Sequence, residues 1–215
     1  MPRKALMMKK YLLLALATSI SALLAAPQLS FAAQSASVDS VPASRPLRVL
    51  IDPGHGGADA GGSDARLHEK DLNLRLALGL KAALEAQGMQ VVLTRSEDQE
   101  LKLGERLNVA HQSQADCLIS LHLDAPQAEI PAYMLYYHGQ GEGLAAMLDE
   151  HLRPLLPVSG RDVLQARGLY LVSKSPVPAV MVSGNWALMT RAPEQQALIQ
   201  GLTRGLLAYA ERRLQ

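Results

Sequence analysis

The stretch VLIDPGHGG, from Val49 to Gly57, predicts the end of a buried strand followed by a glycine-rich loop. The apolar run Val49–Ile51 is typical of a strand inside a sheet, and Pro53-Gly54 ends it at once. His55 therefore follows directly after a strand, among residues without bulky side chains. In open α/β sheets, ligands bind in the crevice beyond the carboxyl ends of the strands. By this pattern alone, His55 is a metal ligand, a base or a loop residue without a chemical role.

Further along the chain, short apolar runs alternate with helical patterns. Leucines that recur every fourth residue predict a helix over 69–87, and Gly88 ends it. Strand, helix, strand, helix, strand is the signature of βαβ units and a parallel sheet in a single α/β domain. The other strands are predicted at 90–94, 116–121, 132–137, 169–172 and 179–182, and the other helices at 101–112, at 141–155 and from Pro193 onward.

The first 32 residues have the pattern of a secretory signal peptide. Four basic residues precede the apolar run Tyr11–Ala26, and Ser30-Phe31-Ala32 stands where a signal peptidase cleaves. The alternative is an uncleaved membrane anchor, but a spanning helix needs roughly 20 apolar residues. We expect cleavage after Ala32, a flexible linker over 33–46 and one domain over 47–215. The protein would then be periplasmic or secreted, without a membrane attachment.

Charge and cysteine content bear on two properties, nucleic-acid binding and disulfide bonding. The whole chain carries 21 Lys and Arg against 20 Asp and Glu, and residues 1–32 hold four of the basic residues and none of the acidic ones. The mature chain therefore has 17 basic against 20 acidic residues, a net charge of −3. This balance gives no support for nucleic-acid binding. Cys117 is the only cysteine, so no internal disulfide forms, and its place in an apolar run is typical of a core residue. We expect a monomer.

A histidine stands at the end of each of two predicted strands. His55 follows the first strand and its Pro53-Gly54 turn, and His122 comes directly after the strand at 116–121. Glu69 opens the first predicted helix. Because the carboxyl ends of neighbouring parallel strands meet at one edge, these three side chains can converge. Two histidines and a carboxylate, with water in the open position, are a usual ligand set of catalytic zinc. Taken singly, each residue has an ordinary alternative: a loop histidine, a helix N-terminal charge and a core histidine. The other histidines fall on predicted exposed positions: His68, His111, His138 and His151.

Three runs carry a resemblance to a known family: VLIDPGHGGADAGG (49–62), HEKDLNLRLALGLKAALEAQGMQVVLTR (68–95) and LGERLNVAHQSQADCLISLHLDA (103–125). With the segments that follow, residues 47–213 resemble the zinc-dependent N-acetylmuramoyl-L-alanine amidases. The resemblance implies one Zn²⁺ bound by His55, Glu69 and His122, and a mixed, mainly parallel sheet of about six strands with helices on both faces. It also implies peptidoglycan as substrate, cut between the lactyl group of muramic acid and L-alanine during cell-wall remodelling.

One departure from the family concerns the catalytic base. Where the family has a glutamate after Pro-Ala-Val, this chain has Ser183, and loss of a general base typically costs roughly 10²–10⁴-fold in rate. Asp124 is the nearest carboxylate that could replace it, but we interpret Asp124 as a partner that orients a ligand histidine. Glu129 and Glu142 are weaker candidates.

Two functional hypotheses follow, an exported zinc amidase and a zinc-binding pseudo-amidase that binds peptidoglycan without turnover. A structural or adhesive domain would not explain three converging ligands. Arg95 and Arg106 resemble positions that the family keeps, and we interpret both as structural. Asn185 and Trp186 are weak candidates for substrate contact. The sequence does not identify an activator protein.

Overall fold

The computed structural model describes residues 45–64, 66–124, 131–156 and 162–214. The predicted signal peptide and all but the last two residues of the predicted linker lie outside this part of the chain.

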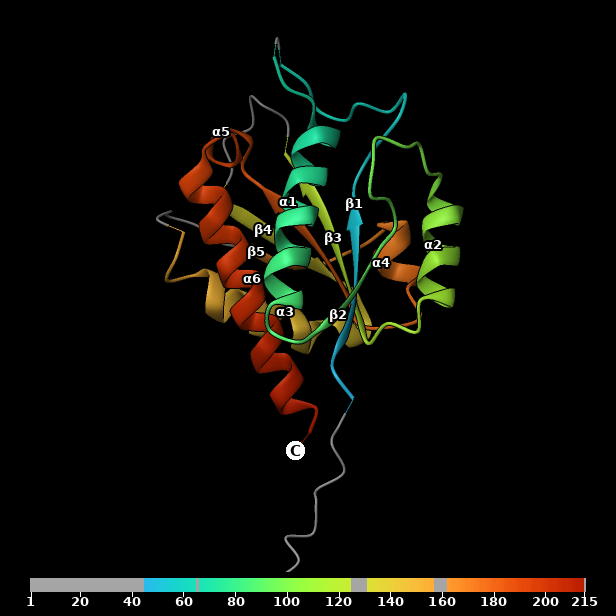
Figure 1. The fold of residues 1–215 in the computed structure, drawn as a ribbon, viewed down its shortest axis with the longest axis vertical. Coiled ribbons are helices and arrows are strands. Elements are labelled where there is room, and N and C mark those ends of the chain that lie inside the picture. The colour runs from blue at the N-terminus through green and yellow to red at the C-terminus, as the bar shows by residue number, and fades with distance from the viewer. Residues whose placement is uncertain (1–44, 65, 125–130, 157–161, 215) are drawn as a thin grey trace, which may run out of the picture. The chain divides into compact units, whose positions relative to one another are not determined.

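A six-stranded sheet forms the centre of the described chain (Figure 1). Its strands lie in the order β2-β1-β3-β6-β4-β5, and β4 runs antiparallel to β6 while every other neighbouring pair is parallel. This confirms the predicted α/β fold with a mixed, mainly parallel sheet. The strands are β1 (Arg48–Pro53), β2 (Gln90–Leu93), β3 (Cys117–Leu123), β4 (Tyr133–Tyr137), β5 (Asp162–Gln165) and β6 (Ala179–Gly184).

Helices cover both faces of the sheet (Figure 1). The apolar stripes of α1, α3 and α6 pack against one face, and those of α2 and α4 pack against the other. The first face is therefore covered more fully than the second. The helices are α1 (Glu69–Glu85), α2 (Leu103–Gln112), α3 (Glu142–Leu152), α4 (Tyr170–Lys174), α5 (Trp186–Met189) and α6 (Ala192–Arg212), with one 3₁₀ turn, η1 (Gly139–Gly141).

The face under α2 and α4 changes from apolar to polar along the strands. Side chains alternate between the two faces of a strand, and on β3 this places Leu118 in the core beneath α2 and α4 with Ser120 and His122 further along on the same side. The same order holds on β1, where Leu50 is followed by Asp52. A polar stripe therefore leads to the carboxyl edge of the sheet.

Cys117 is fully buried in the core against α1, α3 and α6, which confirms its prediction as a core residue. Burial raises the pKa of its thiol to about 12, so it stays protonated and is a poor nucleophile.

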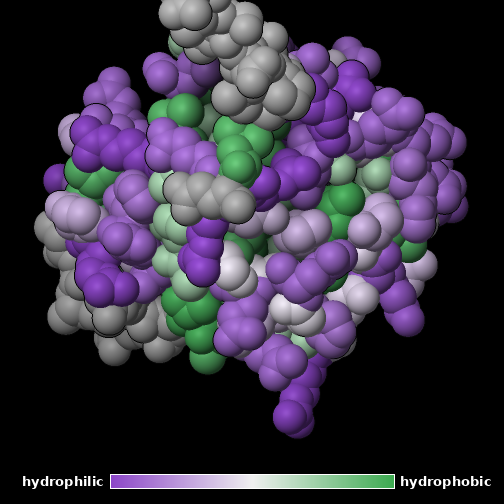
Figure 2. Space-filling model, turned by 90° about the horizontal axis from the view of Figure 1, so that it is seen from below, coloured by the Kyte–Doolittle hydropathy of each residue, from purple (hydrophilic) through white to green (hydrophobic). Residues whose placement is uncertain are grey.

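At the end of the molecule seen from below, the described residues in view are mostly hydrophilic and the hydrophobic ones form small separate patches (Figure 2).

Two elements differ from the sequence prediction. Residues 169–172 were expected to form a strand, but Tyr170–Lys174 form α4, whose Leu171 and Val172 pack on the sheet. A short apolar run looks alike in a buried strand and in a buried helical turn. The strand at this edge is instead β5, whose apolar run is only two residues long, Val163 and Leu164, and both are exposed. Within the described residues, no helix is long and apolar enough to cross a membrane.

Candidate metal centre and active site

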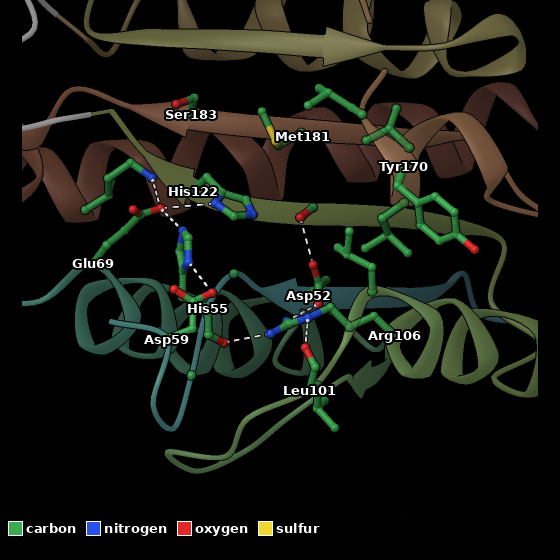
Figure 3. Close-up of a pocket in the computed structure, with 18 of the residues that line it drawn as sticks. Asp52, His55, Asp59, Glu69, Leu101, Arg106, His122, Tyr170, Met181 and Ser183 are labelled. Atoms are coloured by element: carbon green, nitrogen blue, oxygen red, sulfur yellow. Dashed lines mark hydrogen bonds and ion pairs between the residues drawn. The ribbon is translucent and has the colours of Figure 1, made fainter. Parts of the chain in front are cut away.

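His55, Glu69 and His122 come together at the carboxyl edge of the sheet (Figure 3). His55 Nε2 and His122 Nδ1 each lie 3.1 Å from the same carboxylate oxygen, Glu69 Oε1. The two imidazole rings meet edge to face with their centroids 4.9 Å apart. The three residues that the sequence predicts as ligands therefore form one cluster, although they lie on the loop after β1, on α1 and on β3.

The pairing of β1 with β3 brings the two histidines together. Pro53 is in register with Leu121, and the Gly54 amide continues the pairing by donating to the Leu121 carbonyl at 2.9 Å. The loop then passes so close to His122 that a Cβ on Gly54 would lie 2.3 Å from the imidazole ring. Position 54 therefore requires glycine for His122 to occupy its place.

Two arginines hold the backbone of the loop that carries His55. Arg106 donates to the carbonyl oxygens of His55 at 2.7 Å and of Pro53 at 2.8 Å. Arg95 donates to the carbonyl oxygens of Gly54 at 2.9 Å and of Pro53 at 3.0 Å. His55 needs this support because its backbone has φ = 61°, a left-handed conformation that is unfavourable for residues other than glycine. The predicted structural role of both arginines agrees with these contacts.

Arg106 is itself held by a buried carboxylate. Asp52, which is 1% exposed, receives hydrogen bonds from Arg106 Nη1 at 2.7 Å, from Thr94 Oγ1 at 2.6 Å and from Ser120 Oγ at 2.8 Å. A charge this deeply buried is stable only when it is paired and hydrogen-bonded. The polar stripe beneath the cluster is thus a fully partnered network that supports the loop.

Glu69 is fixed at both carboxylate oxygens. The backbone amide of Leu123 donates to Oε1 at 3.0 Å and that of Gly62 donates to Oε2 at 2.8 Å, while Asn73 Nδ2 lies 3.3 Å from Oε1. Burial opposes ionisation, but the hydrogen bonds from His122, His55 and the two amides outweigh it and lower the pKa of the Glu69 carboxyl. Glu69 is therefore an anion, which is the form that binds a metal.

Asp59 is a residue of the site that the sequence reasoning missed. Its Oδ2 lies 2.8 Å from His55 Nδ1, on the side of the ring away from Glu69 (Figure 3). The hydrogen bond with Glu69 raises the pKa of His55, burial opposes the rise, and the hydrogen bond with Asp59 adds to it. The available signal was an aspartate four residues after His55 within the same glycine-rich loop.

The residues present fit a zinc ion. Zinc takes imidazole nitrogen and carboxylate oxygen as ligands, and a tetrahedral site with bonds of 2.0–2.1 Å places its ligand atoms about 3.3 Å apart. Each of the three residues has a ligand atom within 4.8 Å of those of the other two, and Glu69 Oε1 lies 3.1 Å from both His55 Nε2 and His122 Nδ1. Three protein ligands leave one tetrahedral position open, as in catalytic zinc sites.

A cavity of about 670 Å³ extends from the cluster along the second face of the sheet, between α2 and α4. This is within the range of ligand pockets, roughly 300–1,000 Å³. Its far end is mainly apolar, and Leu103 and Tyr170, which line it, are 56% and 44% exposed. Room beside the ligands therefore exists for a substrate much larger than water.

Across the cavity from the loop lies Ser183 on β6, in register with His122 on β3 (Figure 3). Its Oγ donates to Asp124 Oδ2 at 2.8 Å. Burial raises the pKa of Asp124, the bond from Ser183 opposes this, and the charge of Glu69 adds to the rise. In the described contacts, Asp124 therefore lies against Ser183. The carboxylate that contacts the outer nitrogen of a cluster histidine, Nδ1 of His55, is that of Asp59.

The remaining candidates lie away from the cluster or outside the described chain. Asn185 caps α5 by accepting from the Leu188 amide, and Trp186 is 5% exposed with Nε1 donating to Asp64 at 3.3 Å. Glu142 begins α3 and is not among the residues that line the cavity. Glu129 lies outside the described residues.

Comparison with known proteins agrees with the fold. Residues 49–200, more than half of the chain, match the family model of N-acetylmuramoyl-L-alanine amidases. The germination-specific N-acetylmuramoyl-L-alanine amidase of Bacillus subtilis is 27% identical over 186 residues, which cover 75% of this chain and 78% of that protein.

Two solved structures are similar over most of the described chain. The catalytic domain of CwlV, an N-acetylmuramoyl-L-alanine amidase from Bacillus (Paenibacillus) polymyxa, superposes with a TM-score of 0.71 at 26% identity, covering 77% of this chain and 98% of that one. The CwlD amidase from Clostridioides difficile, solved in complex with the GerS lipoprotein, gives 0.71 at 25% identity, with coverage of 77% and 99%. On the family match, the fold and the three-residue cluster together, this chain belongs to the N-acetylmuramoyl-L-alanine amidase family.

Proposed function

We propose that this amidase uses one zinc ion, held by His55, Glu69 and His122, to hydrolyse the amide between the lactyl group of N-acetylmuramic acid and L-alanine in peptidoglycan. The observation that carries the proposal is the convergence of three ligand atoms, two pairs of them 3.1 Å apart, at one end of a cavity. The family supplies the substrate class, and the cluster supplies the chemistry.

Bound there, zinc supplies Lewis acidity, which polarises the amide carbonyl and makes water more acidic. The chain's own residues set the geometry of this reaction. Arg95 and Arg106 fix the backbone that carries His55, and the amides of Leu123 and Gly62 hold the Glu69 carboxylate. The cavity beside the cluster leaves room for the polymer.

Proton transfer distinguishes this chain from the family pattern. Amide hydrolysis requires a group that takes a proton from water and delivers it to the leaving amine. The position next to His122 on β6 is occupied by Ser183, a hydroxyl that donates its hydrogen to Asp124. A second function is therefore a pseudo-amidase, which keeps the metal site and binds peptidoglycan without turnover.

The deciding experiment incubates the purified, zinc-loaded protein with intact sacculi. The amidase proposal expects release of stem peptides with a free N-terminal alanine, lost on treatment with a chelator and restored by zinc. A protein that sediments with sacculi but releases nothing supports the pseudo-amidase instead. If the protein neither releases peptide nor sediments with sacculi, both functions are wrong.

Glu69→Gln tests the ligand role separately from the helix-terminal role. If Glu69 binds zinc, the glutamine variant loses stoichiometric metal. If it serves only as a charge at the N-terminus of α1, the variant keeps its zinc and loses about 0.3–1 kcal/mol of stability. Metal content by mass spectrometry and unfolding of the metal-free protein separate the two roles.

We also propose that the chain is exported to the periplasm or secreted, with cleavage after Ala32. The pattern of basic residues, apolar run and Ser30-Phe31-Ala32 supports this. N-terminal sequencing of the protein recovered from cells tests it. A mature chain that begins at Ala33 is expected, and an intact Met1 in the membrane fraction would contradict it.

A further inference from the structure

The loop after His55 turns back on the histidine itself. The Gly56 amide donates to the Asp59 carbonyl at 2.9 Å and the Asp59 amide donates to the Gly56 carbonyl at 3.2 Å. This tight turn returns the Asp59 side chain to the outer nitrogen of the imidazole, where Oδ2 lies 2.8 Å from Nδ1. The opposite ring nitrogen, Nε2, faces Glu69 at 3.1 Å.

The second carboxylate oxygen of Asp59 has a different partner. Oδ1 accepts a hydrogen bond from the Gly61 amide at 3.1 Å. One residue later, Gly62 donates to Glu69 Oε2 at 2.8 Å and accepts from the Glu69 amide at 2.8 Å. Residues 59–62 therefore connect the outer side of His55 to the outer side of Glu69.

The same loop allows no extra side-chain bulk at its closest point. A Cβ on Gly61 would lie 2.6 Å from Glu69 Oε2 and 2.6 Å from His55 Cδ2, and the backbone there has φ = +66°. Asp59 is thus the polar side chain of a segment packed directly against two proposed ligands.

We propose that Asp59 is a positioning residue for the metal site, which accepts the hydrogen of His55 Nδ1 and so turns the lone pair of Nε2 toward Glu69 and His122. A neutral imidazole has one donor and one acceptor nitrogen, and the partner of one decides the role of the other. Outer partners of this kind typically contribute 10- to 100-fold to metal affinity. This inference rests on the zinc site proposed above.

The competing explanation is that Asp59 only shapes the turn through its bond to the Gly61 amide. The two roles require both carboxylate oxygens, and an asparagine side chain has a single acceptor oxygen. Asp59→Asn therefore keeps the size and the turn-forming capacity of the residue but cannot serve His55 and Gly61 together. Asp59→Ala removes both contacts.

The test measures zinc affinity by competition with a chromophoric chelator for the wild type, Asp59→Asn and Asp59→Ala. We expect Asp59→Ala to bind zinc roughly 10- to 100-fold more weakly, and Asp59→Asn to fall between it and the wild type. Ser63→Ala is the matched control, since it removes a hydroxyl that lies 2.9 Å from Nδ1 of His68, a histidine outside the cluster. The control keeps wild-type affinity. Wild-type affinity in both Asp59 variants, each folded by circular dichroism, would overturn the proposal.

A second readout needs no metal. Nitrogen NMR of the metal-free protein, at alkaline pH where the imidazole is neutral, reports which nitrogen of His55 carries the hydrogen. Carboxylates face both ring nitrogens in the metal-free protein, Asp59 at Nδ1 and Glu69 at Nε2, so the informative quantity is the fraction of His55 that carries the hydrogen on Nδ1. Asp59→Ala is expected to lower this fraction relative to the wild type, and an equal fraction in the two proteins overturns the positioning role even if zinc binds. A wild type that binds no zinc contradicts the proposed function, and the NMR result still decides whether Asp59 orients His55.

Discussion

The two sides of the cavity are built very differently. On the side of the loop and α1, His55 and Glu69 are held by contacts from several elements, including two arginines, two backbone amides and Asp59. On the opposite side, the Ser183 hydroxyl has one hydrogen bond among the described residues, to Asp124. The difference indicates that the geometry of the three-residue cluster is under strong structural constraint, while the position expected to hold a base is occupied by a small side chain whose hydroxyl has one polar contact among the described residues.

The two sides are also supported by different kinds of group. The ligand side depends on a buried ion pair, Arg106 with Asp52, whose members are 4% and 1% exposed. Removing one member of such a pair leaves an unpaired buried charge and is strongly destabilising. On the Ser183 side, a hydroxyl lies beside the half-buried carboxylate of Asp124. We expect substitutions on this side to cost less stability than substitutions in the buried ion pair. Substitutions on the two sides should therefore separate metal binding from turnover.

The largest effect is expected from removing a ligand. His55→Ala and His122→Ala should each weaken zinc binding by more than about 10²-fold, because loss of an outer partner alone costs 10- to 100-fold. Metal content after dialysis measures this, and peptide release should vanish with the metal. His68→Ala, an exposed histidine next to Glu69, is the control. Retained stoichiometric zinc in either ligand variant would show that the cluster is not the metal site.

Ser183→Glu should have the next largest effect, in the opposite direction. In register with His122 on the adjacent strand, a glutamate there would supply a carboxylate beside the cluster, and a general base typically contributes about 10²–10⁴-fold in rate. The rate of peptide release from sacculi measures the gain. Ser183→Gln has the same size without the charge and should give no gain. Equal rates for the glutamate and glutamine variants would mean that proton transfer at this position does not limit the reaction.

Arg106→Met tests the support of the ligand side. It leaves the Asp52 carboxylate buried with only Thr94 and Ser120 as donors, so we expect a loss of about 3–5 kcal/mol in the free energy of unfolding. Urea denaturation of the metal-free protein measures it. The same substitution at the exposed Arg75 of α1 should change stability by less than about 0.5 kcal/mol. Similar values at the two positions would contradict the role given to the buried pair.

The smallest effect is expected from Ser183→Ala. Loss of its hydrogen bond to the half-buried Asp124 should cost about 1 kcal/mol and leave zinc affinity unchanged. Ser120→Ala makes the comparison within one experiment, since its hydroxyl donates to the deeply buried Asp52 and its loss should cost more, about 1.5–3 kcal/mol. A larger loss for Ser183→Ala than for Ser120→Ala would reverse the contrast between the two sides.

The sequence predicted the sheet well because its central strands are short apolar runs that end in turn-forming residues. It predicted β1, β3 and β6 to within a few residues. It failed at 169–172, where the apolar run LYLV forms a helical turn, and at β5, whose exposed apolar side chains give no alternation. The two errors have different causes, because Leu171 and Val172 of α4 are buried while Val163 and Leu164 of the edge strand β5 are exposed.

The predicted ligands converge because strand ends in a parallel sheet share an edge, which is a property of topology. Their supports could not be predicted in the same way. The contacts of Asp59 and Arg106 depend on the path of a loop whose histidine takes a left-handed backbone conformation. No periodicity in the sequence reports that path, because the contacts involve backbone carbonyls and a side chain that turns back on its own loop.

The pairing of β1 with β3 would also link the proposed zinc ion to the folding equilibrium. His55 and Glu69 lie close in the sequence, but His122 joins them only when the Gly54 amide and the Leu121 carbonyl are paired. An ion that prefers the paired state stabilises it by mass action, by about 2.7 kcal/mol when its free concentration is 100 times its Kd. If the cluster binds zinc as proposed, the midpoint of thermal unfolding should rise with zinc concentration, and the folded fraction of the protein would then depend on zinc supply.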